Sequence, residues 1–259
     1  MMNNRERIWD IIVRSLQMNL HNFDKEPFHV EHKKIKKIVS SVTDIPNNVK
    51  EIRLLGNHIT RERRPHFFRK NNLFLLPASN RSWNIIKGDG YFDLPLDNLD
   101  VEKFNSNLKF ELDTLDDSST SESKYISQAF SKGIIQHFTS QNELFLTLNG
   151  RKYTTFNFKA YGHELLCNKI QIEIDAGYET KDEVILIEAK SAGKISNEVI
   201  RQLYFPRKYV STLTTKKIRN IFFVVTDKGK YVNLYEYDFK SIEHYESIYL
   251  VNSKRYKLA

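Results

Sequence analysis

The apolar positions of the first 90 residues follow helical spacing and then give way to short runs. Residues 5–20 and 29–41 are predicted to be helices, because their apolar residues recur every three or four positions. Four lysines, Lys33, Lys34, Lys36 and Lys37, occupy the outer side of the second helix. Residues 73–76 and 83–86 are short apolar runs bounded by turn-forming residues. The pattern predicts an N-terminal region of helices and short strands.

The pattern changes in the second half of the chain. Residues 125–138 keep helical spacing, which predicts one helix. From Glu143 apolar and polar residues alternate, and Asn149-Gly150 predicts a hairpin turn. Further strands are predicted over 152–158, 171–176 and 184–190.

After residue 190 a helix and a hairpin are predicted. Ser196 with Glu198 predicts the start of a helix that runs to about Leu213. Residues 221–226 and 231–239 predict two strands joined by a turn. The order of helix, strands, helix and strands predicts an α/β (α+β) fold, in which a mixed central sheet is flanked by helices.

Charge divides the chain more clearly than hydropathy does. Residues 1–90 carry 17 Lys and Arg against nine Asp and Glu, whereas residues 91–125 carry three against nine. The acidic stretch contains TLDDSSTSES, which is typical of a linker. We therefore expect an N-terminal region at 1–120 and a second domain at 121–259. A basic region attracts phosphate backbones, although the same charges also serve an ordinary solvated surface.

Composition removes several classes of protein. The scarcity of Gly and Pro, nine and six residues, argues against fibrous and disordered chains. The one cysteine, Cys167, excludes a disulfide framework and a zinc site of several thiolates. The first residues lack the apolar run of a signal peptide, and no stretch has the roughly 18 apolar residues of a membrane span. We expect a soluble, cytoplasmic protein with no membrane partner.

The strongest candidate for chemistry lies in residues 171–190, QIEIDAGYETKDEVILIEAK. Because side chains alternate along a strand, Glu173 and Asp175 share one face, as do Glu188 and Lys190 in the next strand. The turn between the strands is short, so they are expected to be antiparallel neighbours. Asp175 and Glu188 could then share one face of the sheet, with Lys190 one step beyond.

Such a pair of carboxylates suits Mg²⁺, which binds one or two carboxylates together with waters and phosphate oxygens. Asp175 and Glu188 are therefore the predicted metal ligands. With Lys190 they are the predicted catalytic residues, because the lysine can hold an attacking water or offset charge on phosphoryl oxygens. The alternative interpretation is a solvated sheet face with a cross-strand ion pair.

The same residues carry a family resemblance. Asp175, an apolar run at Val184–Ile187 and then Glu188-Ala189-Lys190 resemble the PD-(D/E)XK nuclease superfamily, with type II restriction endonucleases as the nearest match. Ile174 stands where the superfamily's name has proline. The resemblance covers about residues 122–240. It implies a restriction-endonuclease-like sheet, Mg²⁺-dependent hydrolysis of double-stranded DNA and a homodimer.

Four further residues are accessory candidates. Members of the superfamily often carry a glutamine on the helix after the Glu-x-Lys strand, a place that Gln202 would fill, and an accessory carboxylate, for which Glu164 is a candidate. Glu173 and Glu179 lie close to the main residues in the sequence. A solvated surface position is the alternative for all four.

The candidates for DNA contact are basic residues in two segments. The first is the densest basic cluster of the chain, beside Phe67 and Phe68, and the second follows the catalytic segment. Arginine forks suit phosphates and guanine edges alike. The candidates are Arg61, Arg63, Arg64, Arg69 and Lys70 in the first segment, and Arg201 and Arg207 in the second. Each segment could instead be an ordinary basic surface.

Three functional hypotheses follow. The favoured one is a Mg²⁺-dependent type II restriction endonuclease, whose residues 1–120 recognise DNA and whose residues 121–259 cleave it. The second is a repair or recombination nuclease of the junction-resolvase type on the same fold. The third is a non-catalytic DNA-binding protein with a nuclease-like core.

Overall fold

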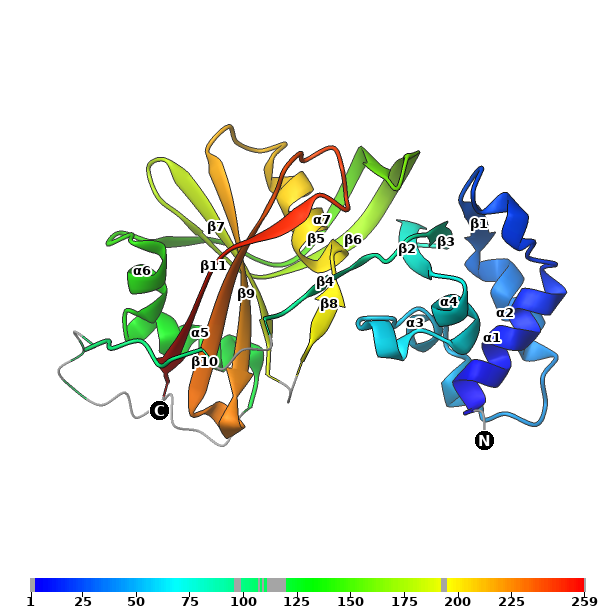
Figure 1. Ribbon diagram of the computed structural model, residues 1–259, viewed down its shortest axis with the longest axis horizontal. Coiled ribbons are helices and arrows are strands. Elements are labelled where there is room, and N and C mark those ends of the chain that lie inside the picture. Colours follow the sequence, from blue (N-terminus) through cyan, green and yellow to red (C-terminus); the bar gives the residue numbers. More distant parts are fainter. Residues whose placement is uncertain are drawn as a thin grey trace.

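The strands of the second half form the centre of the molecule (Figure 1). The computed structural model describes residues 3–95, 99–106, 108, 110, 120–191 and 195–258. Within these residues one nine-stranded mixed sheet runs in the order β1-β3-β2-β6-β7-β9-β10-β11, and β5 pairs with β6 outside this path. A separate two-stranded sheet joins β4 to β8.

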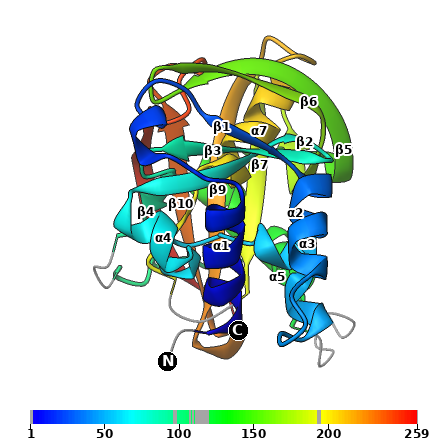
Figure 2. The ribbon, with the colours of Figure 1, turned by 90° about the vertical axis from the view of Figure 1, so that its right-hand side faces the viewer.

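The N-terminal part consists of short helices packed on one end of the sheet. In Figure 2 α1 and α2 face the viewer, with strands behind them. Helix α1 begins after Asn3, whose side chain accepts a hydrogen bond from the Glu6 amide (2.9 Å), as an N-cap residue does. The elements are α1 (Asn4–Ser15), β1 (Phe28–Glu31), α2 (His32–Ser40), α3 (Ile52–Leu55), α4 (His66–Lys70), β2 (Leu73–Ser79) and β3 (Ser82–Lys87), with 3₁₀ turns at Leu20–Asn22, Asn47–Lys50 and Arg61–Arg63.

The second part holds the rest of the large sheet, with helices on both faces. Its elements are β4 (Tyr91–Asp93), α5 (Glu122–Ser131), α6 (Ile134–Thr139), β5 (Phe145–Ala160), β6 (His163–Glu179), β7 (Glu183–Lys190), β8 (Asn197–Val199), α7 (Arg201–Val210), β9 (Lys217–Thr226), β10 (Tyr231–Phe239) and β11 (Ile248–Lys257), with a 3₁₀ turn at Asp227–Gly229. The predicted mixed α/β architecture, a large mixed sheet flanked by helices, is confirmed.

Strand β9 shows how the sheet separates two layers of core. Phe222 and Val224 pack with Leu203 and Tyr204 of α7, whereas Phe223, between the first two, packs with α5 and α6. This alternation is the period-two pattern of a strand that is buried on both faces. The sheet is therefore sandwiched between α7 and the α5–α6 pair.

The N-terminal part shares its core with the second part. Its own cluster is built around Trp9, Ile35 and Phe68. However, Phe74 and Leu76 of β2 belong to the α7-side cluster of the large sheet. The two parts are therefore joined by packed apolar side chains as well as by the chain itself.

The predicted hairpin turn at Asn149-Gly150 is wrong. Strand β5 continues through both residues and pairs with β6, and the chain reverses at Tyr161-Gly162, where φ is positive at both residues (50° and 85°). The register shifts beside Gly150, whose φ is 71°. The turn signal of Asn149-Gly150 is thus absorbed by an irregularity within a long strand, because pairing along the whole of β6 outweighs the local preference.

Three predicted helices are also corrected. The helix predicted at 125–138 is two helices, α5 and α6, separated at Gly133 (φ 80°). The helix predicted from residue 29 begins at His32, because β1 pairs with β3. The helix predicted from Ser196 begins at Arg201, because Asn197–Val199 forms β8 and pairs with β4. Strand β11 was not predicted. None of the helices among the described residues has the length and apolar character needed to cross a membrane.

Candidate functional site

The predicted catalytic residues lie where β6 and β7 stop pairing. The two strands are antiparallel, and their ladder ends at the pair Ala176 and Ile187. Asp175 and Glu188 are the residues that follow this last pair, and the sequence predicted two antiparallel neighbouring strands here. The apolar run that precedes Glu188 is buried, and β7 lies in the middle of the sheet between β6 and β9. The run fixes Glu188 at the end of a rigid strand.

An irregularity in β6 determines which way Asp175 points. Ile174 packs with Leu186, whereas Ala176 packs with Ile187 on the other face of the sheet. Two residues that are two positions apart thus face opposite sides, because the register with β5 shifts between Ile174 and Gly177. A bulge of this kind re-aims a side chain. The simple alternation from which we predicted the face of Asp175 therefore does not hold at this residue.

Asp175 is fixed by the backbone of the neighbouring strand. Its Oδ2 accepts a hydrogen bond from the amide of Ala189 (2.7 Å), at a point where the β6–β7 ladder has already ended. Burial raises the pKa of Asp175, and the Ala189 amide and the charge of Lys190 partly oppose that rise. The Asp175 carboxylate is thus fixed by the Ala189 amide and lies within electrostatic reach of Lys190.

Glu188 and Lys190 form a buried ion pair. Glu188 is 7% exposed, and its Oε1 accepts hydrogen bonds from Lys190 Nζ and from Gln202 Nε2, the latter at 2.7 Å. Burial raises the pKa of Glu188 to about 7, and the charge of Asp175 adds to the rise. Burial lowers the pKa of Lys190, but the carboxylates of Glu188 and Glu198 outweigh this and raise it overall. The lysine is therefore a cation that is paired with Glu188 and lies within electrostatic reach of Glu198.

Asp175 and Glu188 each keep one oxygen for another ligand. No described residue forms a hydrogen bond with Asp175 Oδ1 or Glu188 Oε2. Two nearby carboxylates of raised pKa, each with an open oxygen, fit Mg²⁺, which completes its shell with water and phosphate. No group of three or more His, Cys, Asp or Glu that could hold a metal occurs in the described part of the chain. Asp175 and Glu188 are the residues that could hold the ion.

Of the accessory candidates, Gln202 forms a hydrogen bond with a site residue, and Glu173 lines a small pocket together with Glu188 and Gln202. Glu179 is ion-paired with Lys216, and Glu164 lies 3.5 Å from Lys159 at the hairpin end of β6. Glu173 is exposed, with an oxygen 3.8 Å from Arg151, although its charge still acts on Asp175. These three carboxylates have surface partners, whereas Gln202 holds Glu188.

Sequence reasoning missed two carboxylates beside the site. Glu198, on β8, is 1% exposed, and burial raises its pKa to about 7, with Lys190, Arg201 and Arg63 acting against the rise. Glu122, in the first turn of α5, accepts a hydrogen bond from the Ser191 amide (3.2 Å). No local signal marks either residue, because Glu198 lay in a predicted helix and Glu122 at the edge of an acidic stretch.

The arginines of the N-terminal basic cluster fall into two groups. Arg61 is ion-paired with Asp89 and Asp93, and Arg64 is buried and donates to the Leu73 carbonyl (3.1 Å). Arg69 is ion-paired with Glu6 (3.1 Å). Arg63 and Lys70 are exposed and form no ion pair with any described residue. The cluster is thus largely structural.

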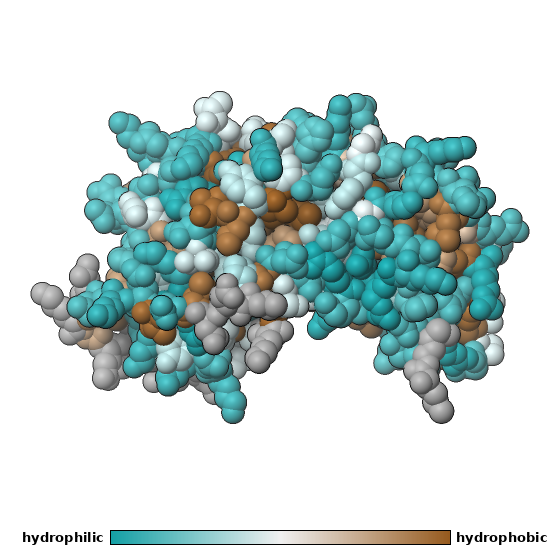
Figure 3. Space-filling model, in the orientation of Figure 1, coloured by the Kyte–Doolittle hydropathy of each residue, from teal (hydrophilic) through white to brown (hydrophobic). Residues whose placement is uncertain are grey.

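The two candidates on α7 differ in the same way. Arg207 is ion-paired with Asp238 (2.7 Å). Arg201 forms no ion pair with the residues that the structure describes, and it lies within electrostatic reach of Glu198, as Arg63 does. Arg63 and Arg201, from different parts of the chain, therefore both lie near the carboxylate site. Figure 3 shows a broad hydrophilic surface where the two parts meet.

Fold and site together define an α/β protein with a buried carboxylate–lysine centre at the end of a central strand. Residues 86–257 match a family described as a domain of unknown function (DUF6997), and residues 6–85 match another domain of unknown function (DUF6996). Because the first match covers more than half of the chain, the protein belongs to the DUF6997 family. The two matches meet earlier than residues 120–121, where the sequence suggested a boundary. No match was found among curated proteins or solved structures.

Proposed function

We propose that the protein is a Mg²⁺-dependent endonuclease of the restriction type, which hydrolyses phosphodiester bonds of double-stranded DNA at a specific sequence. The observation that carries the proposal is the meeting of Asp175, Glu188 and Lys190 at the end of the β6–β7 ladder. A solvated ion pair, the alternative interpretation, does not account for a Glu188 side chain that is buried, held by Gln202 and raised in pKa to about 7.

The chain's own residues support this chemistry. Asp175 and Glu188 would hold the Mg²⁺, which when bound stabilises charge on phosphoryl oxygens and lowers the pKa of water. Lys190 is positioned to hold the attacking water or to offset charge that develops on the phosphate. Gln202 orients Glu188 through Oε1, so that Oε2 would be available to the ion. Arg63 and Arg201, which form no ion pair with a described residue, can bind the flanking phosphates.

By the same resemblance we propose a homodimer, whose two sites would cut the two strands. The molar mass of the protein in solution, with and without DNA, tests this part separately.

The decisive experiment is incubation of the purified protein with phage DNA, in Mg²⁺ and in EDTA. Discrete fragments in Mg²⁺ alone are the expected result. The Glu188→Ala variant provides the control for a contaminating nuclease. Cleavage that persists in EDTA or in that variant, or no cleavage with any divalent metal, would contradict the proposal.

A further inference from the structure

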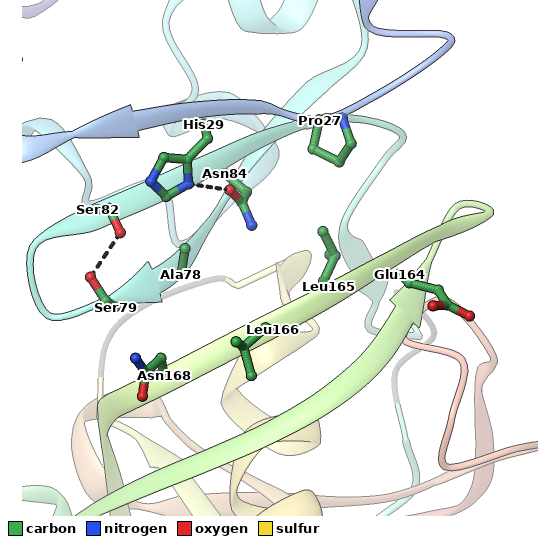
Figure 4. Close-up of a pocket in the computed structure, with 10 residues that line it drawn as sticks. All are labelled: Pro27, His29, Ala78, Ser79, Ser82, Asn84, Glu164, Leu165, Leu166 and Asn168. Carbon is green, nitrogen blue, oxygen red and sulfur yellow. Dashed lines mark hydrogen bonds between the residues drawn. The ribbon is translucent and has the colours of Figure 1, made fainter.

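A groove separates the N-terminal strands from β6. Its first section, about 510 Å³, is lined from one side by residues of β1–β3 and from the other by residues of β6 (Figure 4). A second section of about 600 Å³ shares His29, Ser79 and Ser82 with the first and continues toward α2. The two sections therefore form one channel.

The groove lies along a sheet face whose other half is buried in the core on the α7 side. On β2, Phe74 and Leu76 are buried in the α7-side core, and Ala78, next on the same face, lines the groove. On β3, Ile86 is in that core, and Asn84 lines the groove. On β3 this face thus changes from a buried isoleucine to a half-buried asparagine, whereas on β2 it remains apolar and buried at Ala78.

The two walls of the groove are fixed relative to each other. Ser79 of β2 pairs with Asn168 of β6, and Cys167 Sγ donates to the Pro77 carbonyl (3.1 Å). Asn80 Oδ1 accepts a hydrogen bond from the Gln171 amide (3.1 Å). The groove is consequently present without a ligand, which lowers the entropic cost of binding one.

The groove presents polar nitrogen atoms that have no hydrogen-bond partner among the described residues. His29 Nδ1 donates to Asn84 Oδ1 (2.8 Å), which leaves the amide nitrogen of Asn84 pointing away from His29, into the space between β3 and β6 (Figure 4). His32 Nε2 is buried and has no hydrogen-bond partner among the described residues, and His32 lines the second section. Unpaired polar atoms of this kind favour a polar ligand.

The second section is also cationic. Lys33 and Lys36 of α2 and Arg81 of the β2–β3 turn line it, and none of the three forms an ion pair with a residue that the structure describes. Glu31 is the one carboxylate that lines it. Lys34 and Lys37, on the same helix, do not line the groove.

We propose that this groove is a second DNA-contact site, in which Lys33, Lys36 and Arg81 bind backbone phosphates and the Asn84 amide faces acceptor groups of the nucleotide. This rests on the proposed function for its choice of DNA. Charge complementarity and unpaired donors support a phosphate-bearing polymer with acceptor edges. The cationic second section of the groove lies within the segment that matches the second family, and the first section adds a wall from β6.

The test measures binding of a fluorescein-labelled 30-base-pair duplex by fluorescence anisotropy in EDTA, across a range of salt concentrations. The variant Lys33→Gln/Lys36→Gln is compared with Lys34→Gln/Lys37→Gln, which removes the same charge from the same helix outside the groove. We expect the slope of log affinity against log salt to fall by about 2 in the first variant, with a loss of affinity of roughly 10-fold or more. The second variant should lose clearly less.

Asn84→Leu and Arg81→Gln extend the test to the strands. Each should weaken binding severalfold while thermal unfolding stays close to that of the parent protein. Equal losses in the two lysine variants, binding unchanged in all groove variants, or binding of RNA in place of duplex DNA would overturn the inference.

The outcomes separate this inference from the proposed function. If the parent protein cleaves DNA and the groove variants bind and cleave equally well, the nuclease proposal is supported and the groove is not a DNA-contact site. Binding that depends on the groove residues, without cleavage in any divalent metal, would support the groove as a DNA-contact site and contradict the nuclease proposal.

Discussion

The carboxylate site and the N-terminal arginine cluster are both dense in charge, but they differ in how the charge is balanced. Arg61, Arg64 and Arg69 each have a carboxylate or carbonyl partner close at hand. At the carboxylate site, burial raises the pKa of Asp175 and of Glu188 although Lys190 is close by. Charge density in a sequence is therefore a poor guide to function. A charged group that the fold buries without full compensation is a better indicator of a functional site.

The largest expected effect is on catalysis. Asp175→Asn keeps the shape of the side chain but removes the charge that would hold the metal, so the rate of plasmid cleavage in Mg²⁺ should fall by about 1000-fold or more. Glu173→Gln is the matched control, two residues away on the same strand and exposed, and should stay within about twofold of the parent protein. Equal losses of cleavage rate in both variants would contradict a specific role for Asp175.

The next effect is on stability without metal. Burial holds the pKa of Glu188 at about 7, above the roughly 4.3 of a free glutamate, so the folded state binds the proton more tightly than the unfolded state. The contribution of Glu188 to the free energy of unfolding is therefore fully present below about pH 4.5 and is lost as the pH rises through 7. In EDTA the free energy of unfolding of Glu188→Gln should fall less between pH 5.5 and pH 8 than that of the parent protein, because the variant lacks this titrating group.

Thermal or denaturant unfolding of both proteins at pH 5.5 and pH 8 checks this prediction. Glu198, whose pKa burial also raises to about 7, should leave part of the pH dependence in the variant. An equal fall in both proteins would contradict the prediction. Added Mg²⁺ should stabilise the parent protein and not the variant.

The arginine cluster should respond in the opposite way. Arg64→Gln removes a buried donor from the Leu73 carbonyl and a cation that lies 5.0 Å from the Tyr91 ring centroid. We expect a loss of about 2 kcal/mol in the free energy of unfolding. Arg63→Gln, at an exposed neighbour, should change it by less than about 0.5 kcal/mol and should instead weaken DNA binding. A destabilised Arg63 variant would contradict the division of the cluster.

The smallest predicted effect concerns Glu198, which lies between the two regions. Glu198→Gln removes a negative charge that acts on Lys190, Arg63 and Arg201. We expect kcat to fall about tenfold, because Lys190 loses a group that positions it, while KM for DNA decreases, because the arginines lose a competing anion. A purely structural role would change the melting temperature without this split between kcat and KM.

Local sequence patterns predicted the centre of the site because the relevant geometry there is local. The two-residue period of β7 places Glu188 and Lys190 together, and the short turn makes β6 its neighbour. The face of Asp175 depends on a register shift against β5, which no pattern within β6 reveals. The sequence thus predicted that Asp175 lies near Glu188, although the strict alternation used for that prediction is interrupted by the bulge in β6.

The remaining parts of the site depend on contacts that are distant in the sequence. Glu198 is buried only because β8 pairs with β4, and a helix was the better local interpretation of residues 196–200. Glu122 reaches Ser191 across the fold. The arginine cluster could not be interpreted from sequence either, because the carboxylates that pair with Arg61 and Arg69 come from other segments.

Strand β8 has a consequence for how this protein can be altered by recombination. The Val199 amide donates to the Ile59 carbonyl (2.9 Å), and Asn197 Oδ1 accepts from the Arg61 amide (2.8 Å), so both neighbours of Glu198 are bonded to the N-terminal segment. A chimaera that joins residues 6–85 of one relative to residues 86–257 of another must therefore preserve these contacts in a part of the chain far from the junction. We therefore expect a chimaera to fold only when both segments come from the same relative or when these contacts are kept.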